Sequence, residues 1–176
     1  PITRLELLLG KYLGLAAALA LSTLAGFGMV AVLLSRQMSW ASMYHYFGFM
    51  LSSVLLGLAF LSLAVLLSVL ARDRTRASGL AIATWFFFVL VFDLLLLGVL
   101  VGSGGRFGGE SFALLLLLNP ADVFRILNVF SLEDVRTLYG LATVVPPAMG
   151  SPLKMGGAML VWIAVPLALA HWRFKP

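Results

Sequence analysis

The chain has 176 residues, of which 62% are hydrophobic and only 11% are charged. Soluble domains carry about 25% charged residues, so this composition excludes an ordinary soluble domain and indicates that most of the surface faces lipid. The net charge of +5 lies in short clusters between apolar runs, which is typical of membrane orientation rather than nucleic-acid binding, and the lack of cysteine excludes disulfides and thiolate chemistry.

Four apolar stretches are long enough to cross a membrane as helices, which satisfy every backbone group within one segment. They lie at about residues 14–34, 47–71, 78–101 and 155–170. The third contains Asp93, but its many Leu, Ile, Val and Phe side chains outweigh the cost of about 3 kcal/mol for one central carboxylate. The sequence therefore predicts an all-α, polytopic helical membrane protein, taken as a single transmembrane domain over residues 1–176.

The first predicted span carries small residues at strict four-residue spacing, namely Gly10, Gly14, Ala18, Ser22 and Gly26. Such a stripe lets two helix backbones approach closely in lipid. It predicts a helix-packing face, although glycine and alanine are also simply common in membrane helices. Because the chain starts without Met or a signal peptide, we expect a fragment of a longer protein, and the partner helix is expected in the missing part.

The turn between the second and third spans predicts the orientation of the chain. Arg72, Arg74 and Arg76 lie within five residues, and such short basic loops stay in the cytoplasm. We therefore expect both ends of this chain on the cytoplasmic side of a bacterial inner membrane. Trp40 and Tyr44 then fall at the outer face, where aromatic belts form.

Asp93 is the only ionisable residue within a predicted span. An intramembrane carboxylate is by default a functional candidate. No basic residue lies within a span to pair with it, and it falls on the outer side of the midplane. Two interpretations therefore stay open: a functional group, or a carboxyl that is protonated or bonded to a neighbouring Ser or Thr and merely tolerated.

The connection over about residues 102–154 is too long for a plain loop. We expect it to contain short helices that lie on, or dip into, the outer face of the membrane. Ser131 can cap one of them, with Gly140 as its end.

An earlier helix in this connection is predicted from Asn119, which can cap it with Pro120 at the first helical position. Asp122, Arg125 and Asn128 then recur every three residues and form a narrow polar stripe on an otherwise apolar helix. A local ion pair between Asp122 and Arg125 is expected from this spacing.

Candidate metal and catalytic groups are few. His45 and His171 are expected at opposite membrane faces, so they cannot share a haem or a metal ion within one subunit. Met38, Met43 and Met149 could attract Cu(I), but methionine is also a common apolar filler, and we predict no metal site. The sequence has no P-loop and none of the common hydrolase motifs, so no catalytic residue is assigned.

Three segments resemble ABC-2 type transporter permeases. The chain from Pro1 to Gly14 has the form P-x-x-R-x-E-x-L-L-G-K-x-x-G and resembles the entry to the third transmembrane helix of that family. Residues 77–81, after the arginine-rich turn, resemble the entry to the fifth helix. Residues 118–125 are similar to the outer loop of permeases from nitrous-oxide-reductase maturation systems. The resemblance implies six helices, of which this chain holds the last four.

The resemblance also implies partners and roles. A cytoplasmic ABC ATPase would bind ATP and Mg, with no cofactor in this chain, and a second permease copy would complete a homodimer. It further implies a periplasmic accessory protein and a role in copper-site assembly, by export of a sulfur species. The ATPase-coupling region would be Arg4, Glu6 and Lys11, and the outer-loop partner contact would be Asn119, Pro120, Asp122 and Arg125.

Other functions stay open at this point. The same architecture would suit an ABC-2 exporter of a drug, lipid or glycan. A non-transporting membrane anchor for a periplasmic partner is a rival from another class, and an intramembrane enzyme lacks any catalytic group beyond Asp93. Membrane lipid is an expected partner in every case, and neither the cargo nor a continuous pathway follows from the sequence.

Overall fold

The computed structural model describes residues 3–104, 114–129 and 151–173, and its secondary structure in these ranges is helical throughout. Four helices are long and apolar enough to cross a membrane, which confirms the all-α, polytopic prediction: Leu5–Leu34, Trp40–Leu70, Arg74–Gly102 and Pro152–Arg173. Each extends beyond the predicted span, because the helix continues from the apolar stretch into the polar residues that flank it. The predicted second outer helix, from Ser131 to Gly140, and Met149 lie outside the described residues.

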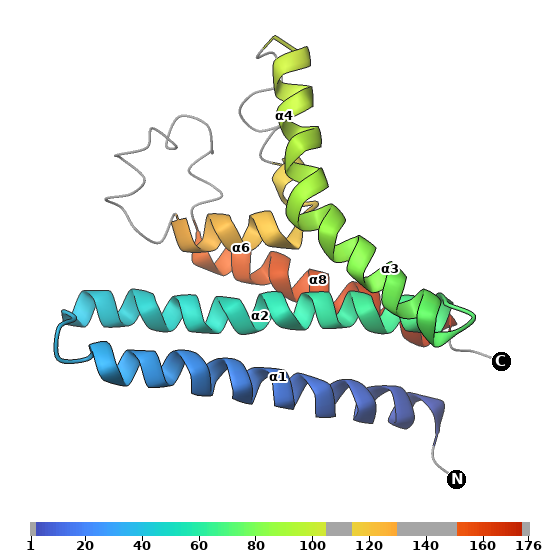
Figure 1. Ribbon diagram of the computed structural model, residues 1–176, viewed down its shortest axis with the longest axis horizontal. Coiled ribbons are helices and arrows are strands. Elements are labelled where there is room, and N and C mark those ends of the chain that lie inside the picture. Colours follow the sequence, from blue (N-terminus) through green and yellow to red (C-terminus); the bar gives the residue numbers. More distant parts are fainter. Residues whose placement is uncertain (1–2, 105–113, 130–150, 174–176) are drawn as a thin grey trace. The chain divides into compact units, whose positions relative to one another are not determined.

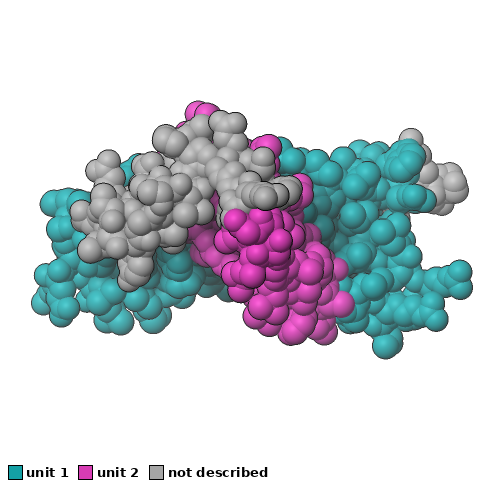
Figure 2. Space-filling view, turned by 90° about the horizontal axis from the view of Figure 1, so that it is seen from above, with its two compact units in different colours: residues 1–81, 160–176 teal, residues 82–159 magenta. Residues whose placement is uncertain are grey.

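The chain divides into two compact units, which Figure 2 colours separately. Unit 1 comprises residues 1–81 and 160–176, and unit 2 comprises residues 82–159. Each unit is described by itself below, and the single domain expected over residues 1–176 stays a prediction.

Unit 1 is built on an antiparallel pair of long helices, α1 (Arg4–Leu34) and α2 (Trp40–Leu70), which lie side by side and are joined by a short turn (Figure 1). Thr3 starts α1 with a capping box: its hydroxyl accepts a hydrogen bond from the Glu6 backbone N–H at 3.2 Å, and the Glu6 carboxylate accepts one from the Thr3 N–H at 2.7 Å. Ser39 caps α2 with its hydroxyl, which accepts a hydrogen bond from the Ser42 N–H at 3.2 Å.

A few specific contacts join α1 to α2. The Tyr12 hydroxyl donates to the Leu58 carbonyl at 3.4 Å and accepts from the Ser62 hydroxyl at 3.1 Å, so the buried polar groups of both helices are satisfied in lipid. The closest approach is at Gly57 of α2, where an added Cβ would lie 2.8 Å from a Leu19 methyl carbon. The glycine on α2 therefore makes room for a leucine of α1.

The predicted helix-packing stripe of α1 makes no such approach in the described residues. Gly10, Gly14, Ala18, Ser22 and Gly26 are all exposed, and a Cβ added at any of the three glycines would meet nothing within 4 Å. The stripe therefore lies open, and a helix that packs on it stays a prediction.

The third span is one continuous helix that changes its geometry midway. It consists of α3 (Arg74–Phe86), a π-helical turn η1 (Phe87–Val91) and α4 (Phe92–Gly102). In η1 the Phe92 N–H bonds to the Phe87 carbonyl, five residues back, which is the wider π pattern. Such turns are rare and occur frequently at functional sites.

Two further helices complete the described fold. Helix α6 (Pro120–Val129) starts at Pro120, as the sequence predicts, and packs on η1 within unit 2. The last helix, α8 (Pro152–Arg173), starts with a proline at its first position and contains Pro166. Its final turn holds His171 and Arg173, where positive charge complements the helix dipole.

Candidate functional site

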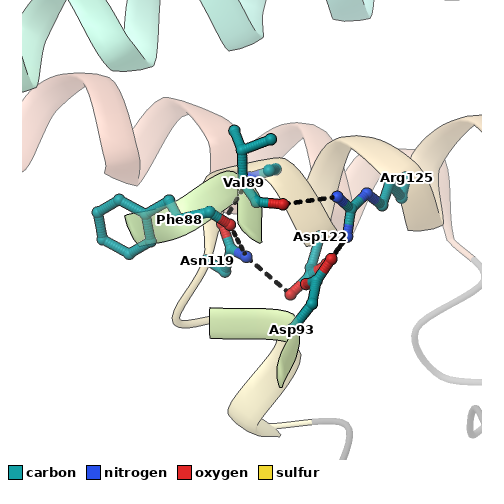
Figure 3. A network of polar contacts seen from close by, with 7 residues as sticks. Phe88, Val89, Asp93, Asn119, Asp122 and Arg125 are labelled. Carbon is teal, nitrogen blue, oxygen red and sulfur yellow. Dashed lines mark hydrogen bonds and ion pairs between the residues drawn. The ribbon is translucent and has the colours of Figure 1, made fainter. Parts of the chain in front are cut away.

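A polar network in unit 2 joins helix α6 to the third span (Figure 3). At its centre the Arg125 guanidinium pairs with two carboxylates: Asp93 of α4, and Asp122 one turn earlier on α6 at 2.9 Å. The Asp122 side chain is 6% exposed, whereas Asp93 and Arg125 are 38% and 45% exposed. The network therefore reaches from a buried carboxylate to an accessible edge.

Asn119 holds the buried side of this network and has no exposed surface. Its side-chain oxygen accepts a hydrogen bond from the Ala121 N–H at 2.9 Å and so caps α6. Its amide nitrogen donates to the Asp122 carboxylate at 2.9 Å and to the Phe88 carbonyl at 2.8 Å. Both amide protons and the amide oxygen are thus used, as a fully buried asparagine requires.

The π-turn presents backbone carbonyls to side chains at the start of α6 and within it. Asn119 bonds the Phe88 carbonyl, and the Arg125 guanidinium donates to the Val89 carbonyl at 3.4 Å (Figure 3). A π-turn loosens the regular ladder of backbone hydrogen bonds, which lets these carbonyls accept side-chain donors. The π-turn therefore supplies the backbone acceptors for the side chains of Asn119 and Arg125.

The network contains two carboxylates for one guanidinium, and this imbalance affects Asp122. Burial, and then the nearby Asp93 carboxylate, raise the pKa of Asp122 to about 6, against the opposing effects of Arg125 and Asn119. A proton on Asp122 balances the charge of the network. The network can therefore take up one proton near neutral pH.

Asp93 has a partner that sequence reasoning missed. Arg125 lies outside the span and 32 residues further along the chain, so a search within the spans could not find it. The signals that could have found it were the predicted outer position of Asp93 and the arginine in the polar stripe of the predicted helix that follows. The local Asp122–Arg125 pair was predicted and is confirmed.

The four residues predicted to contact an outer partner differ in accessibility. Asn119, Pro120 and Asp122 are buried, and Arg125 alone of the four is exposed. Their bonds within this chain account for a capped and anchored helix. A partner contact there stays a prediction, and it would have to use Arg125 or the surface that these residues support.

The other charged residues predicted to form sites belong to unit 1. Glu6 belongs to the cap of α1, and Lys11 lines a pocket together with Arg72 and Arg74. Arg76 instead pairs with Asp73 at 3.3 Å, on the surface. Among the described residues, no group of three or more His, Cys, Asp or Glu side chains could hold a metal ion.

Comparison with known proteins agrees with this membrane architecture. A family model described as "ABC-2 family transporter protein" matches residues 1–176. The chain therefore belongs to the ABC-2 transporter family and is a multi-pass membrane protein of that family.

Two curated proteins are similar to this chain, and both are named "Probable ABC transporter permease protein NosY". The protein from Stutzerimonas stutzeri is 40% identical over 184 residues, and the protein from Pseudomonas aeruginosa is 42% identical over 182 residues. In each case the match covers 99% of this chain and 65% of the relative. The chain thus spans somewhat less than two thirds of the length of the relatives that it matches.

Proposed function

We propose that this chain is the membrane-spanning permease part of an ATP-driven ABC-2 transporter that supports copper-site assembly in nitrous oxide reductase. The observation that carries the proposal is the identity of 40% and 42%, over nearly the whole chain, to permeases named NosY. The transported cargo is proposed to be a sulfur species. The protein would lie in the bacterial inner membrane with both ends of this chain in the cytoplasm, because the arginine-rich turn follows the positive-inside pattern.

The cytoplasmic end of α1 is the proposed site of ATPase coupling. Arg4, Glu6 and Lys11 lie within its first turns, and the Thr3–Glu6 capping box fixes where the helix begins. A defined helix start is what a segment needs if it transmits the motion of a docked subunit. The partner ATPase would bind ATP and Mg, and a second permease copy would complete the membrane part.

The outer end of unit 2 is the proposed contact for a periplasmic accessory protein. Helix α6 is bonded to the π-turn of the third span by Asn119 and Arg125. A displacement of the third span would therefore carry α6 with it. The network would convert a movement within the membrane into a movement on the outer face.

The first experiment is co-purification of the tagged, intact protein in mild detergent. We expect a separate ATP-hydrolysing subunit to accompany it, and Glu6→Lys to weaken that association. Glu6→Gln is the matched control: glutamine can still close the capping box, so it preserves the start of α1 while removing the charge. If the protein emerges alone and without ATPase activity, a membrane anchor is the better assignment.

The maturation role needs a cellular test. A deletion strain should produce nitrous oxide reductase that lacks copper, and the wild-type gene should restore it. Full copper loading in the deletion strain would contradict the maturation role and favour an exporter of a drug, lipid or glycan on the same architecture. If the ATPase co-purifies but copper loading is unaffected, the permease assignment holds and the cargo assignment fails.

A further inference from the structure

Unit 1 contains a pocket of about 590 Å³ at one end of α1 and α2, beside the arginine-rich turn and the start of α3. All of its lining residues belong to unit 1. The walls are mainly apolar side chains from the two long helices, such as Leu8 and Leu15 of α1 and Leu61 and Val65 of α2. Its volume lies within the range of about 300–1,000 Å³ that is usual for ligand pockets.

The charged groups of this pocket are mostly cationic. Lys11, Arg72 and Arg74 line it, and in the described part of the chain none of the three forms an ion pair. Among the described residues that line the pocket, Asp73 is the only carboxylate. It is engaged by Arg76, through an ion pair at 3.3 Å and a backbone hydrogen bond at 2.8 Å. The described lining therefore carries a net positive charge, and its carboxylate is already paired with Arg76.

The neutral polar groups of the lining are already satisfied. The Tyr12 hydroxyl bonds the Leu58 carbonyl, and the Ser68 hydroxyl bonds the Val65 carbonyl at 2.8 Å. The pocket thus offers a ligand two features only, an apolar wall and a group of cations. A free phosphate would use only the cations, and an uncharged lipid only the wall.

We propose that this pocket binds the headgroup of an anionic phospholipid from the cytoplasmic leaflet. The phosphate would lie against Lys11, Arg72 and Arg74, and the acyl chains would lie along the apolar residues of α1 and α2 toward the membrane interior. Basic pockets between transmembrane helices on the cytoplasmic side are suited to such headgroups. The inference rests on the proposed orientation, and not on the nature of the cargo.

Native mass spectrometry of the intact protein, purified in mild detergent, tests this inference with phosphatidylglycerol and phosphatidylcholine as probes. We expect wild type to retain phosphatidylglycerol in preference to phosphatidylcholine. Each neutralised cation (Lys11→Gln, Arg72→Gln, Arg74→Gln) is expected to weaken retention about fivefold, the usual effect of one basic residue near an anionic membrane surface. Arg36→Gln is the matched control, since it removes one exposed cation at the other end of α1.

Several results would overturn the proposal. They are equal retention of the two lipids, equal loss in the Arg36→Gln control, and unchanged retention in the triple variant. Displacement of the lipid by millimolar inorganic phosphate would assign the site to a free anion instead. Failure of wild type to retain added phosphatidylglycerol would also contradict the proposal. ATPase co-purification is scored in the same preparations, so failure of the lipid site is distinguished from failure of the permease assignment.

Discussion

Arg125 is the residue on which the polar network of unit 2 depends, because among the described residues it is the one cation paired with Asp93 and Asp122. Removing one member of a charged pair leaves the charge of the remaining group uncompensated. This loss costs more free energy than formation of the pair contributes. The exposure of Arg125 and Asp93, at 45% and 38%, moderates this cost through solvent screening. Arg125 therefore stabilises the site mainly by preventing repulsion between two carboxylates.

Replacing Arg125 with Gln is expected to destabilise the protein by about 1–2 kcal/mol, the range for losing a partly exposed, hydrogen-bonded charge. Adding Asp93→Asn should recover part of the loss, because it removes one of the two repelling carboxylates. Thermal unfolding in detergent measures both variants. Arg76→Gln is the control, since it breaks an exposed pair with Asp73 and should change stability by less than about 0.5 kcal/mol.

If the Arg125→Gln and Asp93→Asn effects simply add in the double variant, the two residues do not interact. That outcome would contradict the network, whereas a recovered melting temperature in the double variant supports it.

Asp122 makes the stability of this site depend on pH. Its pKa is raised from 3.8 to about 6 in the folded protein, so the folded state binds this proton more tightly than the unfolded state. The stabilisation is fully present below pH 3.8 and is lost as the pH rises through about 6. We expect the melting temperature of wild type, relative to Asp122→Asn, to fall between pH 4 and 7. A constant difference across this range would contradict the assignment.

At the scale of elements, local sequence rules predict the start of α6 but not its contacts with the third span. Asn119 and Pro120 predict the helix start, and the cap forms as expected. The same asparagine also bonds the Phe88 carbonyl, 31 residues away in sequence, and no local pattern indicates that contact. The π-turn was equally unpredicted, because residues 87–91 are uniformly apolar and carry no local signal for a change in helix geometry.

The two roles of Asn119 can be separated by substitution. Asn119→Ser keeps a capping oxygen but is too short to donate to the Phe88 carbonyl, whereas Asn119→Ala loses both functions. We expect Asn119→Ala to lower the free energy of unfolding by about 2 kcal/mol or more. The loss from Asn119→Ser should be smaller by about 1 kcal/mol. Hydrogen exchange of the α6 amides and thermal unfolding measure these losses. Equal effects of the two variants would mean that the cap contributes nothing.

The packing of α1 on α2 gives a second prediction at this scale. A side chain at Gly57 would meet Leu19 at 2.8 Å, whereas one at Gly48 of the same helix would meet nothing within 4 Å. Gly57→Leu is expected to cost about 1–3 kcal/mol through overpacking, and Gly48→Leu, the matched control, should be close to neutral. Thermal unfolding in detergent compares them. Leu19→Ala should partly rescue Gly57→Leu, and failure to rescue would place the clash elsewhere.

At the scale of the whole molecule, the spans were predictable because each is a long uncharged run, and a helix alone satisfies its backbone in lipid. The contacts between spans were not predictable, because lipid-facing and helix-facing positions are both apolar and composition does not distinguish them. The sequence favoured a stripe of small residues on α1 for close packing, but the described residues use Gly57 of α2. The stripe, from Gly10 to Gly26, remains open for a partner helix.

The proposed coupling requires α6 and the third span to move as one body, and a cross-link tests this directly. Since residues 1–176 contain no cysteine, Asp93→Cys with Arg125→Cys introduces the only thiols within this part of the protein. We expect the double variant to lose copper loading of nitrous oxide reductase, because the ion pair is gone, and to regain it when a bifunctional thiol reagent joins the two positions. Each single variant treated with the same reagent is the control. If the cross-linked protein supports less copper loading than the unlinked one, α6 must separate from the third span during the transport cycle. The network would then have to open during transport, and the proposal that α6 and the third span move as one body would be wrong.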